Sequence, residues 1–134
     1  MEIFIAPIKF YSALLLQNLV TELSKRFTSE IHVIDLKINI DDFFSVDRKQ
    51  YFSTQIIAEA MKFTDKFNGK IILLTDVDIF VPVLTFIFGE AQLNGKHSIL
   101  SVIIVFQKLK VTNINLVMQG RLKNYFYTGF DSDN

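Results

Sequence analysis

The sequence predicts an α/β domain, because two kinds of apolar segment alternate along its first hundred residues. Short β-branched runs are typical of buried strands, and longer runs with apolar residues every three or four positions are typical of amphipathic helices. The order strand, helix, strand, helix, strand predicts parallel strands joined by right-handed crossovers. A chain of 134 residues has the length of one domain, so we expect a single domain.

The first half of the chain contains four of these segments. Residues 2–8 are apolar and predict a buried strand, and residues 10–27 place leucines at helical spacing. Residues 31–40 predict a second strand with a bulge near Asp35, where the apolar alternation slips by one position. Residues 41–48 are polar and charged and predict a loop.

The second half begins with another helix and ends in a hairpin. Residues 50–67 return to helical spacing, and we expect Asn68-Gly69 to end that helix in a left-handed conformation. Residues 70–74 form a continuous apolar run, which predicts a central strand buried on both faces. Asn94-Gly95 is a strong hairpin signal. It predicts an antiparallel edge strand at 86–93 that pairs with a strand at 98–106, and we expect a helix at 114–126.

The counts of individual residue types exclude several kinds of site. Cysteine is absent, which excludes disulfides, thiolate nucleophiles and every cysteine-based zinc site. Only two histidines are present, so one chain cannot form a three-histidine zinc site. Fourteen basic and fourteen acidic residues give a net charge of zero, and we expect neither nucleic acid nor an anionic membrane as partner. Without a recognisable targeting segment or a spanning apolar run, we expect a cytoplasmic protein.

Five polar side chains are candidates for a binding role. Asp76 and Asp78 follow the central strand, at the end where open α/β sheets bind ligands. They predict either a metal site or, as we favour, a turn in which they accept hydrogen bonds from backbone amides. Glu90 predicts either a contact to a cation or substrate or, as we favour, a charge that protects an edge strand from aggregation. We expect His32 to be a hydrogen-bonded structural histidine and His97 to be exposed beside a turn.

Residues 75–92, with the sequence TDVDIFVPVLTFIFGEAQ, closely resemble a block of the archaemetzincin family of zinc metallopeptidases. In that family the block has the form TDVDLFVP followed by NFVFGEAQ. Residues 3–8 resemble the first strand of the family, and RKQY at residues 48–51 resembles its R-x-Q-Y entry to the second helix. Residues 98–102 resemble the strand that follows the block.

The resemblance implies a metzincin-like N-terminal subdomain over residues 1–102, with a divergent tail at 103–134. This subdomain is a twisted mixed sheet, mostly parallel, with two backing helices and an antiparallel edge strand. The edge strand is implied to form the upper rim of a substrate cleft, where a peptide adds as an extra strand. The implied rim residues are Phe86, Ile87, Phe88, Gly89, Glu90, Ala91 and Gln92. The motif residues implied to be structural are Asp76, Asp78, Pro82, Gln50 and Tyr51.

The sequence departs from the family in its chemistry. Metzincins bind zinc through HExxHxxGxxH, whose glutamate is the general base, and archaemetzincins add four cysteines for a second zinc. No His-Glu pair and no cysteine occur here, so we carry over no metal or catalytic residue and expect no cofactor in this chain. Residues 91–130 contain no acidic residue, and we interpret the tail as either an out-of-frame relic of the catalytic helix or a selected divergent sequence.

Two main hypotheses follow for the function. In the first, the chain is an archaemetzincin-like protein that is truncated or frameshifted before its catalytic helix and is inactive as a free chain. In the second, it is a pseudoenzyme that binds a peptide or a partner protein along the edge strand at 86–92. A third, that a partner chain supplies the zinc helix, has less weight because a split cleft needs close positioning. We also expect self-association through apolar surface that a missing subdomain would cover.

Overall fold

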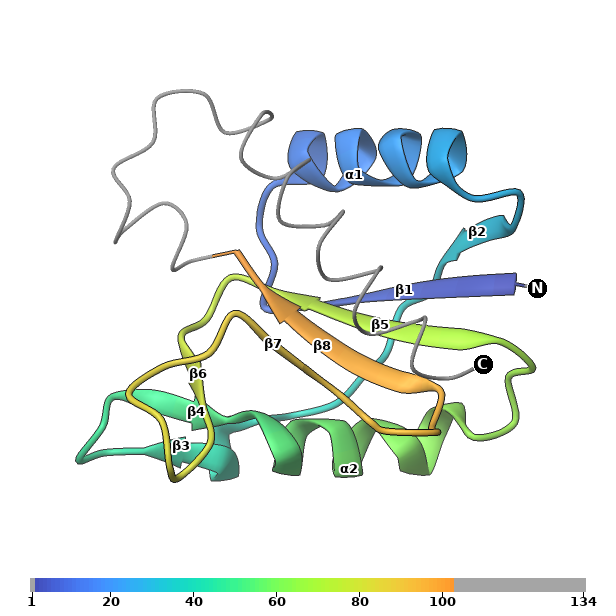
Figure 1. The fold of residues 1–134 in the computed structure, drawn as a ribbon. Helices are drawn as coiled ribbons and strands as arrows, with labels where there is room; N and C mark the ends of the chain where they lie inside the picture. The colour runs from blue at the N-terminus through green and yellow to red at the C-terminus, as the bar shows by residue number, and fades with distance from the viewer. Residues whose placement is uncertain (1, 103–134) are drawn as a thin grey trace.

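A five-stranded sheet with one helix on each face organises residues 2–102, the part of the chain that the computed structural model describes (Figure 1). The strand order is β2-β1-β5-β8-β7, and the first four of these strands are parallel. β7 runs antiparallel to β8 at one edge. The bounds are β1 Glu2–Ile8, β2 Glu30–Val33, β5 Lys70–Thr75, β7 Gly89–Ala91 and β8 His97–Ser101. The predicted α/β class and central strand are confirmed, while the tail and its predicted helix lie outside the described residues.

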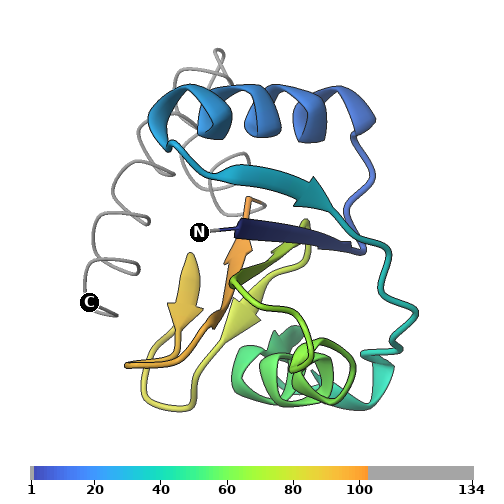
Figure 2. The same cartoon turned by 90° about the vertical axis from the view of Figure 1, so that its right-hand side faces the viewer.

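Helix α1 (Ala13–Arg26) lies on one side of this sheet and helix α2 (Ser53–Thr64) on the other (Figure 2). The buried residues Leu15, Leu19 and Leu23 of α1 recur every fourth position, which puts them on one helical face. Each buried leucine contributes about 1.5–3 kcal/mol relative to an exposed one. The helix begins after Ser12, whose hydroxyl accepts a hydrogen bond from the Leu15 N–H at 3.1 Å.

The central strand β5 separates two apolar clusters, because its side chains alternate between the faces of the sheet. Ile72 and Leu74 belong to the cluster beneath α1. Ile71 and Leu73 belong to the cluster beneath α2. All four side chains are at most 2% exposed, which is why this segment is apolar at every position.

The predicted strand at 31–40 is wrong beyond Val33, where β2 ends. The N–H of Ile34 still donates to the carbonyl of Ile5 at 2.8 Å, after which the segment leaves the sheet. Its side chains continue to alternate between half-buried and exposed positions, and Ile40 at its end is 1% exposed in the α2 cluster. The segment therefore shows the alternation of a strand without a partner strand in the described part of the chain, and no bulge forms near Asp35.

A second, three-stranded sheet occupies residues predicted as a loop and a helix start. It contains β3 (Phe44–Ser45), β4 (Gln50–Phe52) and β6 (Ile79–Phe80), in that order, and a short 3₁₀ helix at Asp41–Phe43 precedes it. β4 pairs antiparallel with β3 and parallel with β6. Helix α2 therefore begins at Ser53 rather than near residue 50, because residues 50–52 extend to pair with both strands.

Two glycine positions predicted as turns differ in their roles. Helix α2 ends at Thr64, so Gly69 does not end it. A Cβ atom at Gly69 would overlap the carbonyl oxygen of Glu2, so the close approach of this loop to β1 requires a glycine. In the predicted hairpin turn before β8, Asn94 has a φ of 59°, as the Asn-Gly signal indicates. Within residues 2–102, no helix has the length and apolar character needed to cross a bilayer.

Candidate functional site

The edge strand β7 has one free side in the described part of the chain. The carbonyl of Phe88 accepts a hydrogen bond from β8 at 2.8 Å, and the N–H of Gln92 donates to β8 at 3.0 Å. Hydrogen-bonded pairs alternate with non-hydrogen-bonded pairs in an antiparallel ladder. The backbone N–H and C=O groups of Gly89 and Ala91 therefore point away from β8, where no strand pairs among residues 2–102. The strand is shorter than the predicted 86–93, although its antiparallel edge position is confirmed.

The side chain of Glu90 joins this strand to the amino end of α2. Its carboxylate accepts a hydrogen bond from the Thr54 hydroxyl at 2.8 Å and lies 3.1 Å from the Ser53 hydroxyl. The residue that precedes α2, Phe52, gives no side-chain cap, and the first turn contains no acidic residue. A carboxylate from a distant strand thus supplies the negative charge that a helix amino terminus favours.

The hydroxyl group of Ser53 lies at the centre of this junction. Its side chain is fully buried, and its hydroxyl lies 3.1 Å from both Glu90 Oε1 and the carbonyl oxygen of Phe80. One hydroxyl proton is therefore shared between the edge strand β7 and the small sheet that contains β6. Ser53 and Thr54 are not among the residues predicted from the sequence, although a helix start without its own acidic cap is a signal that an acceptor comes from elsewhere.

The loop at residues 81–88, which leads into β7, is held by Arg48. The guanidinium donates to the carbonyl oxygens of Pro82 at 3.4 Å and Thr85 at 3.3 Å, and also to that of Leu84. It also lies 4.2 Å from the ring centre of Phe80, in a cation–π contact. An arginine suits this position because its planar fork of donors reaches several carbonyls at once.

A cavity of about 580 Å³ lies beside this loop. Its lining residues are Arg48, Gln50, Asp78, Pro82, Val83, Leu84, Thr85 and Phe86. Gln50 is 6% exposed and accepts a hydrogen bond from Arg48 Nε at 3.1 Å. Its amide nitrogen donates to Asp78 Oδ1 at 3.1 Å and to the Thr85 carbonyl at 3.0 Å. The polar groups that line the cavity therefore form hydrogen bonds with one another, and these bonds fix the shape of the loop.

The two candidate aspartates, Asp76 and Asp78, contact different parts of the structure. Asp76 accepts a hydrogen bond from the backbone N–H of Tyr11 at 2.8 Å, which connects the end of β5 to the start of α1. Asp78 contacts Gln50 through its carboxylate, and its carbonyl accepts from the N–H of Tyr51 at 2.9 Å. The structure does not bring the two carboxylates into one metal-binding group.

The remaining residues of the implied rim contact β6, α2 and one another. Ile87 is 9% exposed, and its N–H donates to the carbonyl of Ile79 at 3.2 Å in a single antiparallel bridge. The rings of Phe86 and Phe88 meet edge to face with centroids 5.6 Å apart. The amide of Gln92 reaches Met61 Sδ at 3.2 Å, which gives β7 a further contact to α2.

His97 is buried, at 2% exposure, and the expectation that it is exposed is wrong. It begins β8 under the last turn of α2, where its Nε2 lies 2.7 Å from the Thr64 hydroxyl. The same hydroxyl lies 2.8 Å from the carbonyl oxygen of Ala60, so it connects the His97 ring to the backbone of α2. Burial lowers the pKa of His97 below its usual value, and the nearby Asp65 only partly opposes this effect.

The residues present do not fit a metzincin zinc. His32 lies on β2 and His97 on β8, with two strands between them, a separation of roughly 14 Å at the usual strand spacing. His97 is also already hydrogen-bonded inside the core. His32 instead lies beside Glu2 and Glu30, which form with it the one group of potential metal ligands among residues 2–102.

Comparisons with known proteins show which proteins this chain resembles in sequence and in fold. No family model matches the sequence. The chain is 32% identical over 104 residues to the archaemetzincin of Archaeoglobus fulgidus, which covers 76% of this chain and 60% of that protein. The crystal structure of the A. fulgidus archaemetzincin complexed with malonate is 28% identical, with a TM-score of 0.62 over 76% of this chain and 61% of that one.

Two further solved structures share the fold at 21% sequence identity. They are archaemetzincin from Methanopyrus kandleri, with a TM-score of 0.62 over 76% of this chain and 58% of that one, and a zinc-dependent peptidase from Methanocorpusculum labreanum, with a TM-score of 0.65 over 81% and 67%. The chain thus spans about 60% of the length of the curated relative that it matches.

Proposed function

We propose that this chain, which is archaemetzincin-like in sequence and in fold over about three quarters of its length, binds an extended peptide along the outer side of β7. The observation that carries the proposal is the edge strand itself. Gly89 and Ala91 direct their backbone groups away from β8, and Glu90 anchors the strand between them to α2. A strand edge that no other strand covers among residues 2–102 is the kind of surface used in β-strand addition.

The number of available backbone groups sets the expected affinity. Two outward-facing residues offer two N–H and two C=O groups, and each hydrogen bond contributes about 0.5–1.5 kcal/mol net. Four such bonds amount to about 2–6 kcal/mol, which corresponds to dissociation constants from tens of micromolar to beyond the millimolar range. We therefore expect weak binding that depends on the peptide backbone more than on one side chain.

Substitution of Ala91 tests this proposal at a single atom. Ala91→Pro removes an outward N–H and leaves the hydrogen bonds to β8 intact, so we expect peptide affinity to fall about 2- to 10-fold. Ala91→Ser keeps that N–H and is the matched control, for which we expect the affinity of the unaltered chain. Chemical-shift titration with an extended peptide measures both. Equal affinity for the two variants, or no binding at tens of millimolar peptide, contradicts the proposal.

We further propose that the 134 residues alone do not hydrolyse peptides. The proposal is supported by the absence of an HExxH sequence and by the separation of the two histidines in the fold. Hydrolysis of a quenched fluorescent peptide library, with zinc added and then chelated, measures this. Turnover that zinc restores after chelation contradicts the proposal and instead favours a zinc site assembled with a partner.

The composition of the tail supports a related proposal about its origin. Residues 91–130 contain no acidic residue and no His-Glu pair, unlike the family pattern that the first hundred residues follow. We propose that a frameshift or truncation removed the catalytic helix from this reading frame. An HExxH sequence in another frame of the coding bases supports this origin. Its absence from every frame, together with selection on the present reading frame, contradicts it.

We also propose that the chain associates with itself at micromolar concentration. Val83 is 88% exposed and Leu84 is 51% exposed in the loop beside the rim, and Leu93 follows β7 with 77% exposure. Exposed apolar side chains near a free strand edge favour association. Sedimentation velocity across a concentration series measures it, and a monomer at every concentration contradicts it.

A further inference from the structure

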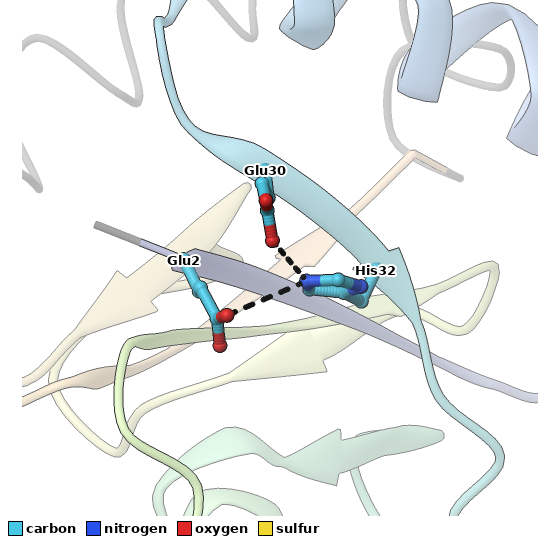
Figure 3. A group of neighbouring side chains, drawn as sticks. All are labelled: Glu2, Glu30 and His32. Atoms are coloured by element: carbon cyan, nitrogen blue, oxygen red, sulfur yellow. Dashed lines mark ion pairs between the residues drawn. The ribbon is translucent and has the colours of Figure 1, made fainter.

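Three side chains meet at the amino ends of β1 and β2, away from the rim (Figure 3). Nε2 of His32 lies 3.4 Å from Glu30 Oε2 and 3.9 Å from Glu2 Oε1. One ligand atom from each residue lies within 4.8 Å of the other two. Neither the proposed function nor the packing of the core uses this group.

The strand register places these residues together. β1 and β2 are parallel with Glu2 opposite Glu30, and Phe4 is opposite His32. Residues two positions apart in a strand share a face, so both carboxylates and the imidazole project to the same side of the sheet. Two like charges directly opposite each other are unfavourable in a sheet. Among residues 2–102, no lysine or arginine forms an ion pair with either carboxylate.

Aromatic packing fixes the orientation of the imidazole. The ring of His32 stacks on Phe4 with centroids 5.2 Å apart and an angle of 24° between the planes. Phe4 in turn contacts Phe67, with ring centroids 4.8 Å apart. The stack leaves one edge of the imidazole facing the two carboxylates (Figure 3). The three side chains are 42–74% exposed, so an ion in solution has access to them.

We propose that Glu2, Glu30 and His32 bind one divalent transition-metal ion, for which Zn²⁺ is the best-fitting probe. One imidazole nitrogen and two carboxylate oxygens are zinc ligands, and water completes a tetrahedron. Zinc–ligand distances near 2.1 Å put tetrahedral ligand atoms about 3.4 Å apart. The Glu30 to His32 distance already has this value, and the exposed side chain of Glu2 closes the remaining gap by rotation.

The ligand set also separates zinc from the hard cations. Ca²⁺ takes six to eight oxygen ligands, and Mg²⁺ demands octahedral oxygen coordination. A site with an imidazole and two carboxylates meets neither requirement and suits a borderline ion. The bound ion offsets the repulsion between the paired glutamates and joins β1 to the edge strand β2. This site is independent of the β7 rim, which lies at the other edge of the sheet.

Calorimetric titration of ZnCl₂ into the full 134-residue chain at pH 7.5 tests the proposal. We expect one zinc per chain, at least tenfold weaker binding in His32→Gln and in Glu30→Gln, and at least tenfold weaker binding of MgCl₂. Asp35→Asn is the matched control, because Asp35 and Glu30 have the same side-chain exposure of 74% and only Glu30 belongs to the group. We expect this control to bind zinc with unchanged affinity.

The two histidines supply a second readout by NMR. We expect zinc to shift the ring signals of His32 and to leave those of the buried His97 unchanged. Glu30→Gln leaves the stacking of His32 on Phe4 in place. A loss of zinc binding in this variant therefore cannot be attributed to the loss of that stacking, as it could be in His32→Gln. Three outcomes overturn the proposal. They are no zinc binding below 1 mM, undiminished binding in both His32→Gln and Glu30→Gln, or a loss in Asp35→Asn as large as in Glu30→Gln.

Discussion

Removing the charge of Glu90 is expected to destabilise the fold far more than removing the charge of an ordinary surface glutamate. Glu90→Gln keeps the size and shape of the side chain and its acceptor oxygen. It removes the negative charge that faces the amino end of α2, a helix that has no side-chain cap of its own. The carboxylate also accepts hydrogen bonds from the Ser53 and Thr54 hydroxyls, and hydrogen bonds to a charged acceptor are roughly twice as strong as neutral ones.

The size of the effect follows from these two losses. A favourable charge at a helix terminus contributes about 0.3–1 kcal/mol at an exposed site and up to about 2 kcal/mol at a partly buried one. Glu90 is half-buried, so we expect Glu90→Gln to lower the free energy of unfolding by about 1–2 kcal/mol. With a urea m-value of about 2 kcal/mol/M, the middle of the range for small proteins, the unfolding midpoint falls by roughly 0.5–1 M.

Urea unfolding followed by far-ultraviolet circular dichroism measures this shift. Glu59→Gln is the matched control, because Glu59 lies on α2 itself and pairs with Lys62 at 2.9 Å on the surface. Such a pair contributes about 0.3–0.5 kcal/mol. A midpoint shift in Glu90→Gln that is no larger than in Glu59→Gln would refute the capping role of Glu90. A change in m-value without a change in midpoint would also do so.

Two further predictions concern His97 and Gly69. Because burial lowers the pKa of His97, the folded state favours its neutral form, so this stabilisation is present above the unfolded-state pKa of about 6.5 and is lost as the pH falls below it. Urea midpoints at pH 7.5 and 5.5 should therefore differ less in His97→Gln than in the unaltered chain, and an unchanged difference argues against this assignment. Gly69→Ala should lower the melting temperature more than Gly95→Ala, since the added Cβ meets the Glu2 backbone in the first and the flexible Gln92 side chain in the second. Differential scanning fluorimetry checks the order, and equal shifts would show that the loop at Gly69 yields.

The order of the main elements could be predicted because it depends on local patterns. Apolar residues at every position predict β5, and leucines at every fourth position predict α1, without any knowledge of partners. The same patterns fail where pairing decides the structure. Residues 34–40 alternate as a strand does, because one side packs on the α2 cluster, yet within the described residues 2–102 no strand pairs with them. Residues 50–52 join a strand because β6, nearly 30 residues away, pairs with them.

The position of the candidate site in the fold can be predicted from the sequence, but the contacts of its side chains cannot. The edge position of Glu90 follows from the hairpin signal, whereas its partners Ser53 and Thr54 are 37 and 36 residues away in the sequence. The turn before His97 predicts an exposed side chain, whereas its burial depends on contacts such as that to Thr64 in α2. Periodicity reports whether a side chain is covered, and it does not report what covers it.

These distant contacts explain how the edge strand β7 and the loop before it keep their shape within residues 2–102. The rim and its preceding loop are held by Arg48 and Gln50, by the hydroxyls at the start of α2, and by the carboxylate of Glu90. All of these groups lie within residues 48–90, and none is a zinc ligand of a metzincin. The energy that orders the edge strand is therefore separable from any metal. A peptide that adds to this edge would meet the same backbone groups of Gly89 and Ala91 whether or not zinc is present, so added zinc should leave the difference in peptide affinity between Ala91→Pro and Ala91→Ser unchanged.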